Sequence, residues 1–307
     1  MSFSEQSRPP LGISATERET GLGKDTLRVW ERRYGFPRPD RDGNGERLYP
    51  AEQVDRLRLV KRLMDQGHRP GRLMAASEED LQALCAPAAA PGRAELVDEG
   101  MLQQLLALVK AHDVPQLRSA LNQAMLRQGL QGFVLETLAA LNRAVGDAWM
   151  RGEFEIFEEH LYTEQVQALL RQAIATLPSG TGSPRILLTT VPEEQHGLGL
   201  LMAEALLALD GASCVSLGTQ TPLFDIAMAA RSQHADVVAL SFSSAYPSRQ
   251  IAPQLAQLRA LLPETIELWA GGGGAGLARL PAQAGVLVMP LLPDALAALV
   301  DWRARKR

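Results

Sequence analysis

The sequence predicts a multidomain chain of α and α/β class, in which two helical parts precede a doubly wound parallel sheet. Helix-type spacing of apolar residues runs through the first two thirds, and short β-rich segments alternate with helical ones in the last third. Two stretches rich in Pro, Gly, Ser and Ala, 86–93 and 178–184, interrupt this pattern and predict linkers. The predicted domains are therefore 1–85, 94–178 and 185–307.

Length and composition place the chain among ordinary globular proteins. It has 307 residues, of which 46% are hydrophobic and 21% are charged, which excludes disordered, collagen-like and coiled-coil classes. No apolar run approaches the roughly 20 residues that span a bilayer, and the polar start lacks a signal-peptide stretch. We therefore expect a cytoplasmic protein with no membrane partner. The two cysteines, Cys85 and Cys214, are too few for a disulfide framework or a Cys-rich metal site.

Charge is unevenly distributed along the chain. Residues 1–75 contain 15 Lys and Arg against 11 Asp and Glu, a net charge of +4, whereas the remaining 16 and 24 give −8. A basic N-terminal part therefore precedes an acidic body. This division predicts a polyanionic partner for the first part only.

The first part begins with two predicted short helices. Ser14, with Glu17 three residues later, is typical of a capping box and predicts a helix that ends near Gly21. A second helix is predicted to begin near Lys24. Two short helices around a glycine-containing turn form a helix-turn-helix pattern.

A hairpin and a longer helix are predicted to follow. The segment 41–45, Arg-Asp-Gly-Asn-Gly, is typical of a tight turn, and 47–49 would form the returning strand of a wing. Apolar spacing then predicts an amphipathic helix from Pro50 to about Gln66. The first part is thus predicted to be a winged helix-turn-helix.

Cationic side chains are concentrated on the second helix and the hairpin. Lys24, Thr26 and Arg28 fall at the start of that helix, where side chains can reach base edges in the major groove. Further arginines extend this surface and suit phosphate groups: Arg32, Arg33, Arg38, Arg41 and Arg47. We expect a double-stranded DNA operator as the partner. The alternative is a solvated basic helical hairpin with no partner.

Residues 11–75 resemble the winged-helix domain of the MerR family of transcriptional regulators. The resemblance rests on LGISATERETGL, DTLRVWERRYGFPRPDR and GERLYPAEQVDRLRLVKRLMDQG, in that order. It implies dimers on two-fold operators and DNA contacts from Thr26, Arg28, Arg33, Tyr34 and Arg47. It assigns core packing to Leu27, Trp30 and Leu48. The long dimer helix and Cys-bearing effector loop of typical members are not evident, so we expect no mercury, copper or redox sensing.

The middle part is helical by periodicity. Helices are predicted near 99–111, 114–127, 130–150 and 155–177, and their short connections predict a four-helix bundle. Trp149 lies at the end of the third helix, and an acidic pair with a histidine begins the fourth, at Glu158, Glu159 and His160. Taken alone, these features are typical of a core aromatic residue and a solvated helix start.

The last part contains five short β-rich segments separated by helical ones. They predict a parallel sheet of the flavodoxin type, with strands at 185–191, 212–218, 236–242, 266–270 and 286–289. Ligands of such sheets bind beyond the carboxyl ends of the strands. The loops that follow these strands are therefore the candidate site.

The loop after the first strand contains a Glu-x-His-x-x-Gly pattern at Glu194, His196 and Gly199. The imidazole could ligate a metal through one nitrogen while Glu194 orients the ring through the other. Taken alone, a histidine in such a loop is usually a polar surface residue. Its place at the ligand-binding face of the sheet favours the metal-binding interpretation.

Two further loops converge on the same face. Hydroxyls follow the third strand at Ser241, Ser243 and Ser244, and glycines follow the fourth at Gly271, Gly272, Gly273 and Gly274. Glycines allow the backbone to approach a bulky group closely. A run of four glycines can also be merely a flexible turn.

These three loops together resemble the cobalamin-binding domain shared by methionine synthase and the mutases. The pattern of that domain is Asp-x-His-x-x-Gly, a Ser-containing loop and Gly-Gly; here Glu194 keeps the carboxylate of the first position. The resemblance implies that His196 displaces the benzimidazole base and becomes the lower axial ligand of cobalt. The freed nucleotide tail would lie along Ser241, Ser243 and 271–274.

The three parts in this order resemble the CarH and LitR group of light-sensing MerR-type regulators over nearly the whole chain. Ala-Trp at 148–149 and Glu-His at 159–160 resemble the cap over the upper face of the cofactor in that group. The resemblance implies adenosylcobalamin, with Trp149, Glu159 and His160 against the adenosyl group. The chain departs at Met150, where the group commonly has a His that takes the upper cobalt position after light. A thioether cannot replace imidazole as a strong ligand of oxidised cobalt.

The resemblance predicts a non-enzymatic, cobalamin-dependent and light-responsive repressor of carotenoid or photoprotective genes. It would assemble as a homodimer or homotetramer when ligand favours the assembled form. One alternative is a light-independent regulator that senses the cobalamin level or another tetrapyrrole, or has lost its ligand, and Met150 favours it. An alternative of another class is a corrinoid methyl carrier or enzyme module. The DNA-binding part and the lack of a barrel or zinc-thiolate site in the sequence disfavour that class.

Overall fold

The structure is a computed structural model of the 307-residue chain. Contacts divide the chain into two compact units, one of 1–92 with 148–153, and the other of 93–147 with 154–307. The predicted linker 86–93 lies outside the described residues. The described residues are 8–65, 68–85, 99–178, 182–274, 276–277, 280 and 284–306.

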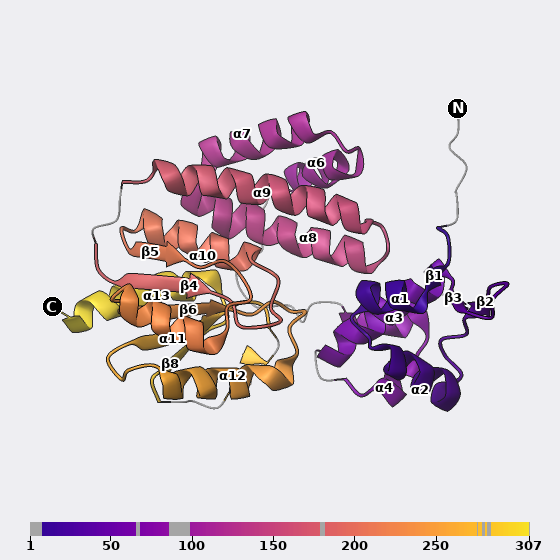
Figure 1. The fold of residues 1–307 in the computed structure, drawn as a ribbon. Helices are drawn as coiled ribbons and strands as arrows, with labels where there is room; N and C mark the ends of the chain where they lie inside the picture. The colour runs from indigo at the N-terminus through magenta and orange to yellow at the C-terminus, as the bar shows by residue number, and fades with distance from the viewer. Residues whose placement is uncertain are drawn as a thin grey trace. The chain divides into compact units, whose positions relative to one another are not determined.

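The N-terminal unit carries the predicted helix-turn-helix and hairpin (Figure 1). Left-handed glycines end its first two helices, Gly21 with φ 67° and Gly35 with φ 66°, which confirms the predicted stop at Gly21. The helices α4 and α5 were not predicted. In chain order the elements are β1 (Leu11–Gly12), α1 (Ile13–Thr20), α2 (Lys24–Tyr34), β2 (Asp40–Arg41), β3 (Arg47–Tyr49), α3 (Ala51–Asp65), α4 (Pro70–Ala75) and α5 (Glu78–Cys85).

Two local predictions in this unit are wrong. The capping box at Ser14 does not form, because α1 already begins at Ile13 and its N-terminal residue Gly12 provides no side-chain cap. Leu48 was predicted to lie in the core, but it is only half-buried, whereas its neighbour Tyr49 is fully buried. Successive residues of a strand point to opposite faces, so only one of these two can face the core.

The small sheet of this unit is antiparallel, with β3 between β1 and β2. Pairing of β2 with β3 confirms the predicted hairpin, whose turn is held by backbone N–H groups of Asn44 and Glu46 that donate to the Asp42 side chain. The pairing of β1 was not predicted. The hydrophobic core below this sheet includes the predicted Leu27 and Trp30 together with Val54, Leu57, Leu63, Leu73 and Leu81.

The four helices predicted for the middle part are present (Figure 1), and all of them except the last residues of the third, 148–150, belong to the C-terminal unit. The backbone breaks at Gly129, with φ 70° and ψ 167°, so the second and third predicted helices are separate, as the sequence indicated. The third includes a π-helical segment that was not predicted. The elements are α6 (Glu99–Lys110), α7 (Val114–Gly132), η1 (Phe133–Leu138), α8 (Ala139–Met150) and α9 (Ile156–Thr176).

The sheet of this unit is parallel, with the strand order β5-β4-β6-β7-β8. This order confirms the predicted doubly wound sheet of the flavodoxin type. Its direction of winding reverses between β4 and β6, and ligands of such sheets bind outside this switch point. The elements are β4 (Arg185–Thr189), α10 (Leu198–Leu209), β5 (Ser213–Ser216), α11 (Leu223–Ser232), β6 (Val237–Ser241), α12 (Ser248–Leu261), β7 (Glu267–Gly271), β8 (Val286–Met289) and α13 (Leu292–Lys306).

Helix α10 joins the sheet to the helical part. It contacts β4 and β6 on one side and α7 and α9 on the other. Figure 1 shows α10 between β4 and α9. A helix that is covered on both sides is apolar all round. Buried residues accordingly run consecutively along α10, at 200–202 and 205–207.

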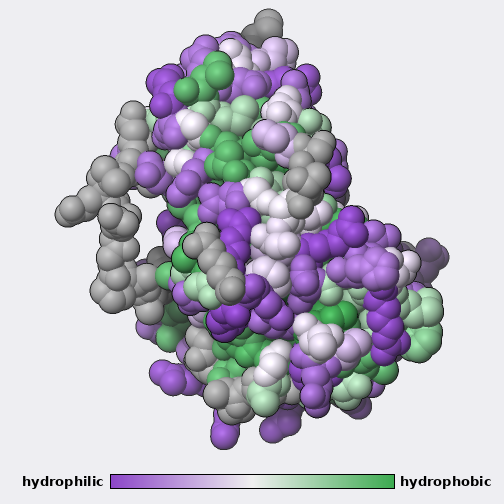
Figure 2. Space-filling view, turned by 90° about the vertical axis from the view of Figure 1, so that its left-hand side faces the viewer, coloured by the Kyte–Doolittle hydropathy of each residue, from purple (hydrophilic) through white to green (hydrophobic). Residues whose placement is uncertain are grey.

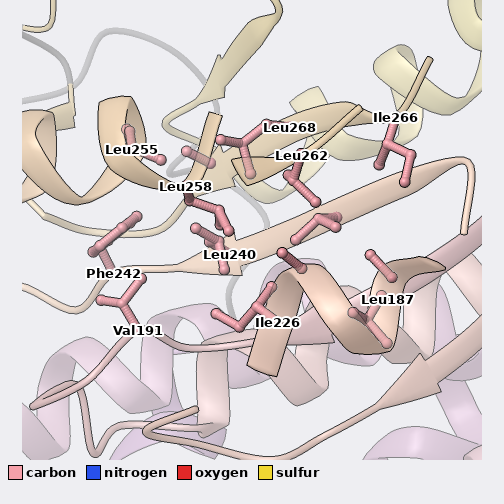
Figure 3. Packing of buried hydrophobic residues seen from close by; sticks show 14 of the residues in the cluster. Leu187, Val191, Ile226, Leu240, Phe242, Leu255, Leu258, Leu262, Ile266 and Leu268 are labelled. Atoms are coloured by element: carbon pink, nitrogen blue, oxygen red, sulfur yellow. The ribbon is translucent and has the colours of Figure 1, made fainter. Parts of the chain in front are cut away.

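The opposite face of the sheet is covered by α11 and α12. Figure 3 shows their side chains meeting those of β4, β6 and β7, with Ile226 and Leu258 facing Leu187 and Leu240. Phe242, just after β6, and Val191, two residues after β4, belong to the same cluster. The core therefore extends to the starts of the loops that carry the candidate site.

The molecular surface is mainly hydrophilic on the face shown in Figure 2, where hydrophobic residues form small separate patches. This agrees with the buried apolar clusters on both faces of the sheet. Within the ranges that the structure describes, no helix is both long and apolar enough to cross a membrane.

Candidate functional site

The loop between β4 and α10 turns around one buried carboxylate. The Glu194 side chain is only 1% exposed, whereas the His196 side chain beside it is 60% exposed. Glu194 Oε1 accepts the backbone N–H of His196 at 2.9 Å and lies 2.8 Å from ring Nδ1 of the same residue. The imidazole is therefore anchored through Nδ1. Its Nε2 has no hydrogen-bond partner among the described residues.

The second carboxylate oxygen of Glu194 is held from the neighbouring strand. Ser243, two residues after β6, donates its backbone N–H to Oε2 at 2.7 Å and its hydroxyl at 2.9 Å. The same hydroxyl lies 3.1 Å from His196 Nδ1. The structure therefore brings together the three predicted residues Glu194, His196 and Ser243 at the switch point of the sheet.

These contacts shift the pKa values of Glu194 and His196 in opposite directions. Burial on its own would raise the pKa of Glu194, but the hydrogen bonds from His196 and Ser243 outweigh burial and hold that pKa below its ordinary value. The hydrogen bond to Glu194 raises the pKa of His196, although burial opposes this. When the ring is neutral, the carboxylate favours the tautomer with its proton on Nδ1, which leaves the Nε2 lone pair free for a metal.

Two of the predicted glycines, Gly271 and Gly272, lie where a side chain would come too close to a neighbouring backbone. A Cβ on Gly272, whose φ is 115°, would lie 2.3 Å from the carbonyl oxygen of Phe242, and one on Gly271 would lie 3.1 Å from the carbonyl oxygen of Met289. A Cβ on Gly199 would lie 3.4 Å from the hydroxyl of the buried Ser241. The loops after β4, β6 and β7 therefore approach one another through backbone and small side chains.

The predicted cap residues fall in different units. Glu159 lies in the first turn of α9 and accepts the hydroxyl of Thr163 at 2.7 Å. His160 follows it directly, and its side chain is 70% exposed. Trp149 is counted with the N-terminal unit, where it packs against the hydrophobic core and the Arg58 guanidinium lies 5.3 Å from its ring centroid. Met150 ends α8, and its side chain lies outside what the structure describes.

The predicted DNA contacts line α2 and the wing, and several have acidic neighbours. Lys24 Nζ lies 3.6 Å from Glu17, Arg28 lies 3.0 Å from Asp25, and Arg47 Nε donates to Glu31 at 2.8 Å. The hydrogen bond to Glu31 raises the pKa of Arg47. Ion pairs of this kind orient the arginine head groups, and DNA phosphates would compete with the carboxylates for them.

The remaining predicted contacts divide between surface and core. Arg33 and Arg38 are exposed, and the Arg33 guanidinium lies 5.3 Å from the ring centroid of Tyr34. Tyr34 is half-buried and packs against the core of the unit, and Thr26 is half-buried on the same helix. The exposed arginines are thus placed for phosphate contacts, while Tyr34 also contributes to packing.

Comparisons with known proteins define the class to which this fold and site belong. The model of the MerR HTH regulatory protein family matches residues 11–74, and that of the B12 binding domain matches residues 101–174. The HTH-type transcriptional repressor CarH of Myxococcus xanthus is 31% identical over 258 residues, which cover 83% of this chain and 86% of that relative. The repressor CarA of the same organism is 31% identical over 267 residues, covering 86% and 87%.

The chain belongs to the family of MerR-type transcriptional regulators with a B12 binding domain, which includes these two repressors. It is thus a regulator and not an enzyme, as the sequence predicted. The solved monomethylamine corrinoid protein of Methanosarcina barkeri has a similar fold, with a TM-score of 0.52 and 12% identity over 67% of this chain and 100% of that chain. That likeness concerns the fold alone.

Proposed function

We propose that the chain is a cobalamin-dependent transcriptional repressor that binds adenosylcobalamin with His196 as the lower axial ligand of cobalt. One observation carries the proposal: an exposed imidazole is anchored through Nδ1 by the buried carboxylate of Glu194, which Ser243 holds in turn. A ring held in this way offers one nitrogen to a metal. The cobalt of a corrin carries its own equatorial ligands and needs one nitrogen from the protein, so the residues fit the group.

The three predicted parts receive separate tasks in this proposal. Residues 1–85 bind operator DNA, 94–178 cap the upper face of the cofactor, and 185–307 hold its lower face and nucleotide tail. The loops after β6 and β7 would hold the nucleotide tail of the cofactor, which His196 would replace at the metal. Support comes from the close approach of those loops, where Gly272 leaves no room for a Cβ and Ser241 and Ser243 offer hydroxyls.

The upper face is assigned to Trp149, Glu159 and His160. When bound, adenosylcobalamin supplies a cobalt–carbon bond that light cleaves. In the dark, the ligand favours a DNA-binding homodimer or homotetramer that represses carotenoid or photoprotective genes, and light removes this bias. The physical basis is linkage, because a ligand that prefers the assembled form stabilises it.

A second candidate is a light-independent regulator that senses the cobalamin level or another tetrapyrrole. Met150 favours it, because the chain offers no imidazole directly after Trp149. A methionine thioether is a weak ligand of oxidised cobalt. Of the three residues assigned to the upper face, His160 offers the imidazole that could take its place, and its side chain is 70% exposed.

The direct test of cofactor binding uses adenosylcobalamin, gel filtration and absorption spectra. The protein should retain the pigment, and His196→Ala should lose it. A protein that retains no pigment, or a His196→Ala variant that retains it fully with an unchanged spectrum, contradicts the proposed role of His196. The matched control is His234→Ala, which removes a histidine from the turn between α11 and β6 instead of from the loop after β4.

Green light separates the two candidates. A spectral change of the bound pigment, together with loss of the dark oligomer, supports the light-responsive repressor; an unchanged pigment and oligomer support the light-independent regulator. The illuminated protein should show no second bound imidazole, whereas Met150→His should. If the illuminated unaltered protein shows a second bound imidazole that is still present in His160→Ala, the proposal that Met150 prevents a second imidazole ligand is wrong.

A further inference from the structure

Thr190 lies directly after β4, beside the turn that carries Glu194 and His196, and is fully buried. Its hydroxyl donates to the backbone carbonyl of Glu194 at 2.6 Å and accepts the backbone N–H of Gln220 at 2.8 Å. One buried hydroxyl therefore links the loop after β4 to the loop after β5, using both its donor and an acceptor position.

Both loops contain a residue with unusual backbone geometry. Glu193 has φ 68° and Gln220 has φ 60°, in the left-handed region that residues other than glycine rarely occupy. Such conformations cost free energy and persist only where the surroundings fix them. Thr190 contacts both places, because it binds the N–H of Gln220 and the carbonyl of the residue after Glu193.

The two loops also meet beside the imidazole. A Cβ on Gly197 would lie 3.0 Å from the methyl carbon of Thr219, so the residue after His196 is in close contact with the loop after β5. The backbone N–H of Thr221 donates to the carbonyl of Thr190 at 3.0 Å. The buried hydroxyl of Thr190 thus connects the end of β4 to the backbone of the turn that carries Glu194 and His196.

We propose that Thr190 is a positioning residue for the metal ligand: its hydroxyl fixes the Glu194 backbone, and through it the direction of His196 Nε2. The inference rests on the proposed function, in which Nε2 binds cobalt. Without the hydroxyl, the Glu194 carbonyl loses a buried donor and the turn relaxes from its left-handed geometry. The cofactor pocket can then still form, but the imidazole no longer meets the metal in one fixed orientation.

The test measures the ligand nitrogen itself. Protein labelled with ¹⁵N-histidine is loaded with cob(II)alamin, whose unpaired electron couples to its axial nitrogen in electron paramagnetic resonance. A protein imidazole then gives a doublet, whereas the unlabelled benzimidazole of the cofactor gives a triplet. Thr190→Val removes the hydroxyl and keeps the shape, Thr190→Ser keeps the hydroxyl, and Thr137→Val removes a buried hydroxyl that binds Gln128 in the helical part.

We expect the doublet in the unaltered protein, in Thr190→Ser and in Thr137→Val. Thr190→Val should lose most of the doublet and bind cobalamin about tenfold more weakly, which is the lower end of the affinity loss expected when a residue that orients a metal ligand is removed. A full doublet in Thr190→Val overturns the inference alone, and absence of the doublet from the unaltered protein overturns the proposed function with it. If Thr190→Val does not fold, Thr190→Ser is compared with Thr190→Ala, and equal doublets in those two variants also overturn the inference.

Discussion

Ser243 donates both its backbone N–H and its hydroxyl to a single carboxylate oxygen of Glu194, at 2.7 and 2.9 Å, across 49 residues of sequence. The other oxygen of Glu194 is left for the backbone and ring of His196. The switch point of the sheet lies between the adjacent strands β4 and β6, so this contact joins the loops that follow these two strands. A charged acceptor with this many donors is strongly held in place.

Replacing Glu194 by Gln should weaken cobalamin binding about tenfold to a hundredfold, the range for loss of a partner that orients a metal ligand. The amide can still accept from Ser243, but it has no charge and offers a donor where His196 Nδ1–H needs an acceptor. Equilibrium titration with cobalamin measures the change. The control is Glu193→Gln, an exposed carboxylate in the same loop. Equal losses of cobalamin affinity in both variants would show that binding depends on the net charge of the loop and not on the contact between Glu194 and His196.

Gly272→Ala should destabilise the C-terminal unit by about 1–3 kcal/mol, the usual cost of forcing a side chain into such backbone geometry. Its φ is 115°, and a Cβ would lie 2.3 Å from the carbonyl oxygen of Phe242. Gly273→Ala is the matched control, since its Cβ would be 4.0 Å from the nearest atom, the backbone nitrogen of Ser244. Thermal unfolding of both variants tests this prediction, and a Gly272→Ala variant as stable as Gly273→Ala would refute it.

Elements with a local signal could be predicted from the sequence. Gly21 ends α1 because a residue with positive φ is needed there, and the turn at 41–45 contains its own side-chain acceptor, Asp42. The five strands follow from short apolar runs, and their crossover helices dictate a parallel sheet. The histidine turn was found because Glu194 and His196 are two residues apart and make their contact within one loop.

Contacts between distant segments could not be predicted in the same detail. The sequence offers three serine hydroxyls after the third strand, Ser241, Ser243 and Ser244, and only the folded arrangement of the loops after β4 and β6 shows that Ser243 reaches Glu194. Thr190 reads as an ordinary strand residue, because its partner Gln220 is 30 residues away. Its position four residues before Glu194 was the one feature of the sequence that could have indicated a contact with the Glu194 backbone. Strand alternation lets only one of Leu48 and Tyr49 face the core, and it is the packing of β3 in the folded unit that buries Tyr49.

Glu158 should make folding stability depend on pH in the acid range. Burial would raise its pKa, but the backbone N–H of Glu155 at 2.7 Å, His112 at 2.8 Å and Lys110 at 3.0 Å together lower that pKa below its ordinary value of 4.5. A carboxylate whose pKa is depressed by folding stabilises the native state above the unfolded pKa. This stabilisation is lost as pH falls below about 4.5 through the folded value.

Glu158→Gln is the corresponding variant. It should lower the free energy of unfolding by about 1–2 kcal/mol at pH 7, because the buried acceptor loses its charge while Lys110 and His112 stay half-exposed. Its stability should then change less than that of the unaltered protein between pH 5 and about pH 3. Urea unfolding at several pH values measures both effects. Glu164→Gln, an exposed position on the same helix, should behave like the unaltered protein.

Arg33→Ala should weaken binding to any duplex DNA and make it less dependent on salt. The residue is exposed on α2, and its guanidinium lies over Tyr34, which limits its freedom before it meets a phosphate. Removing one phosphate contact should reduce the slope of log affinity against log salt by about 0.9. Fluorescence anisotropy with a non-specific duplex at several salt concentrations gives this slope. The control is Arg231→Ala, which replaces an exposed arginine on α11 and should leave the salt slope unchanged. Equal slopes for the unaltered protein and Arg33→Ala would show that Arg33 makes no phosphate contact.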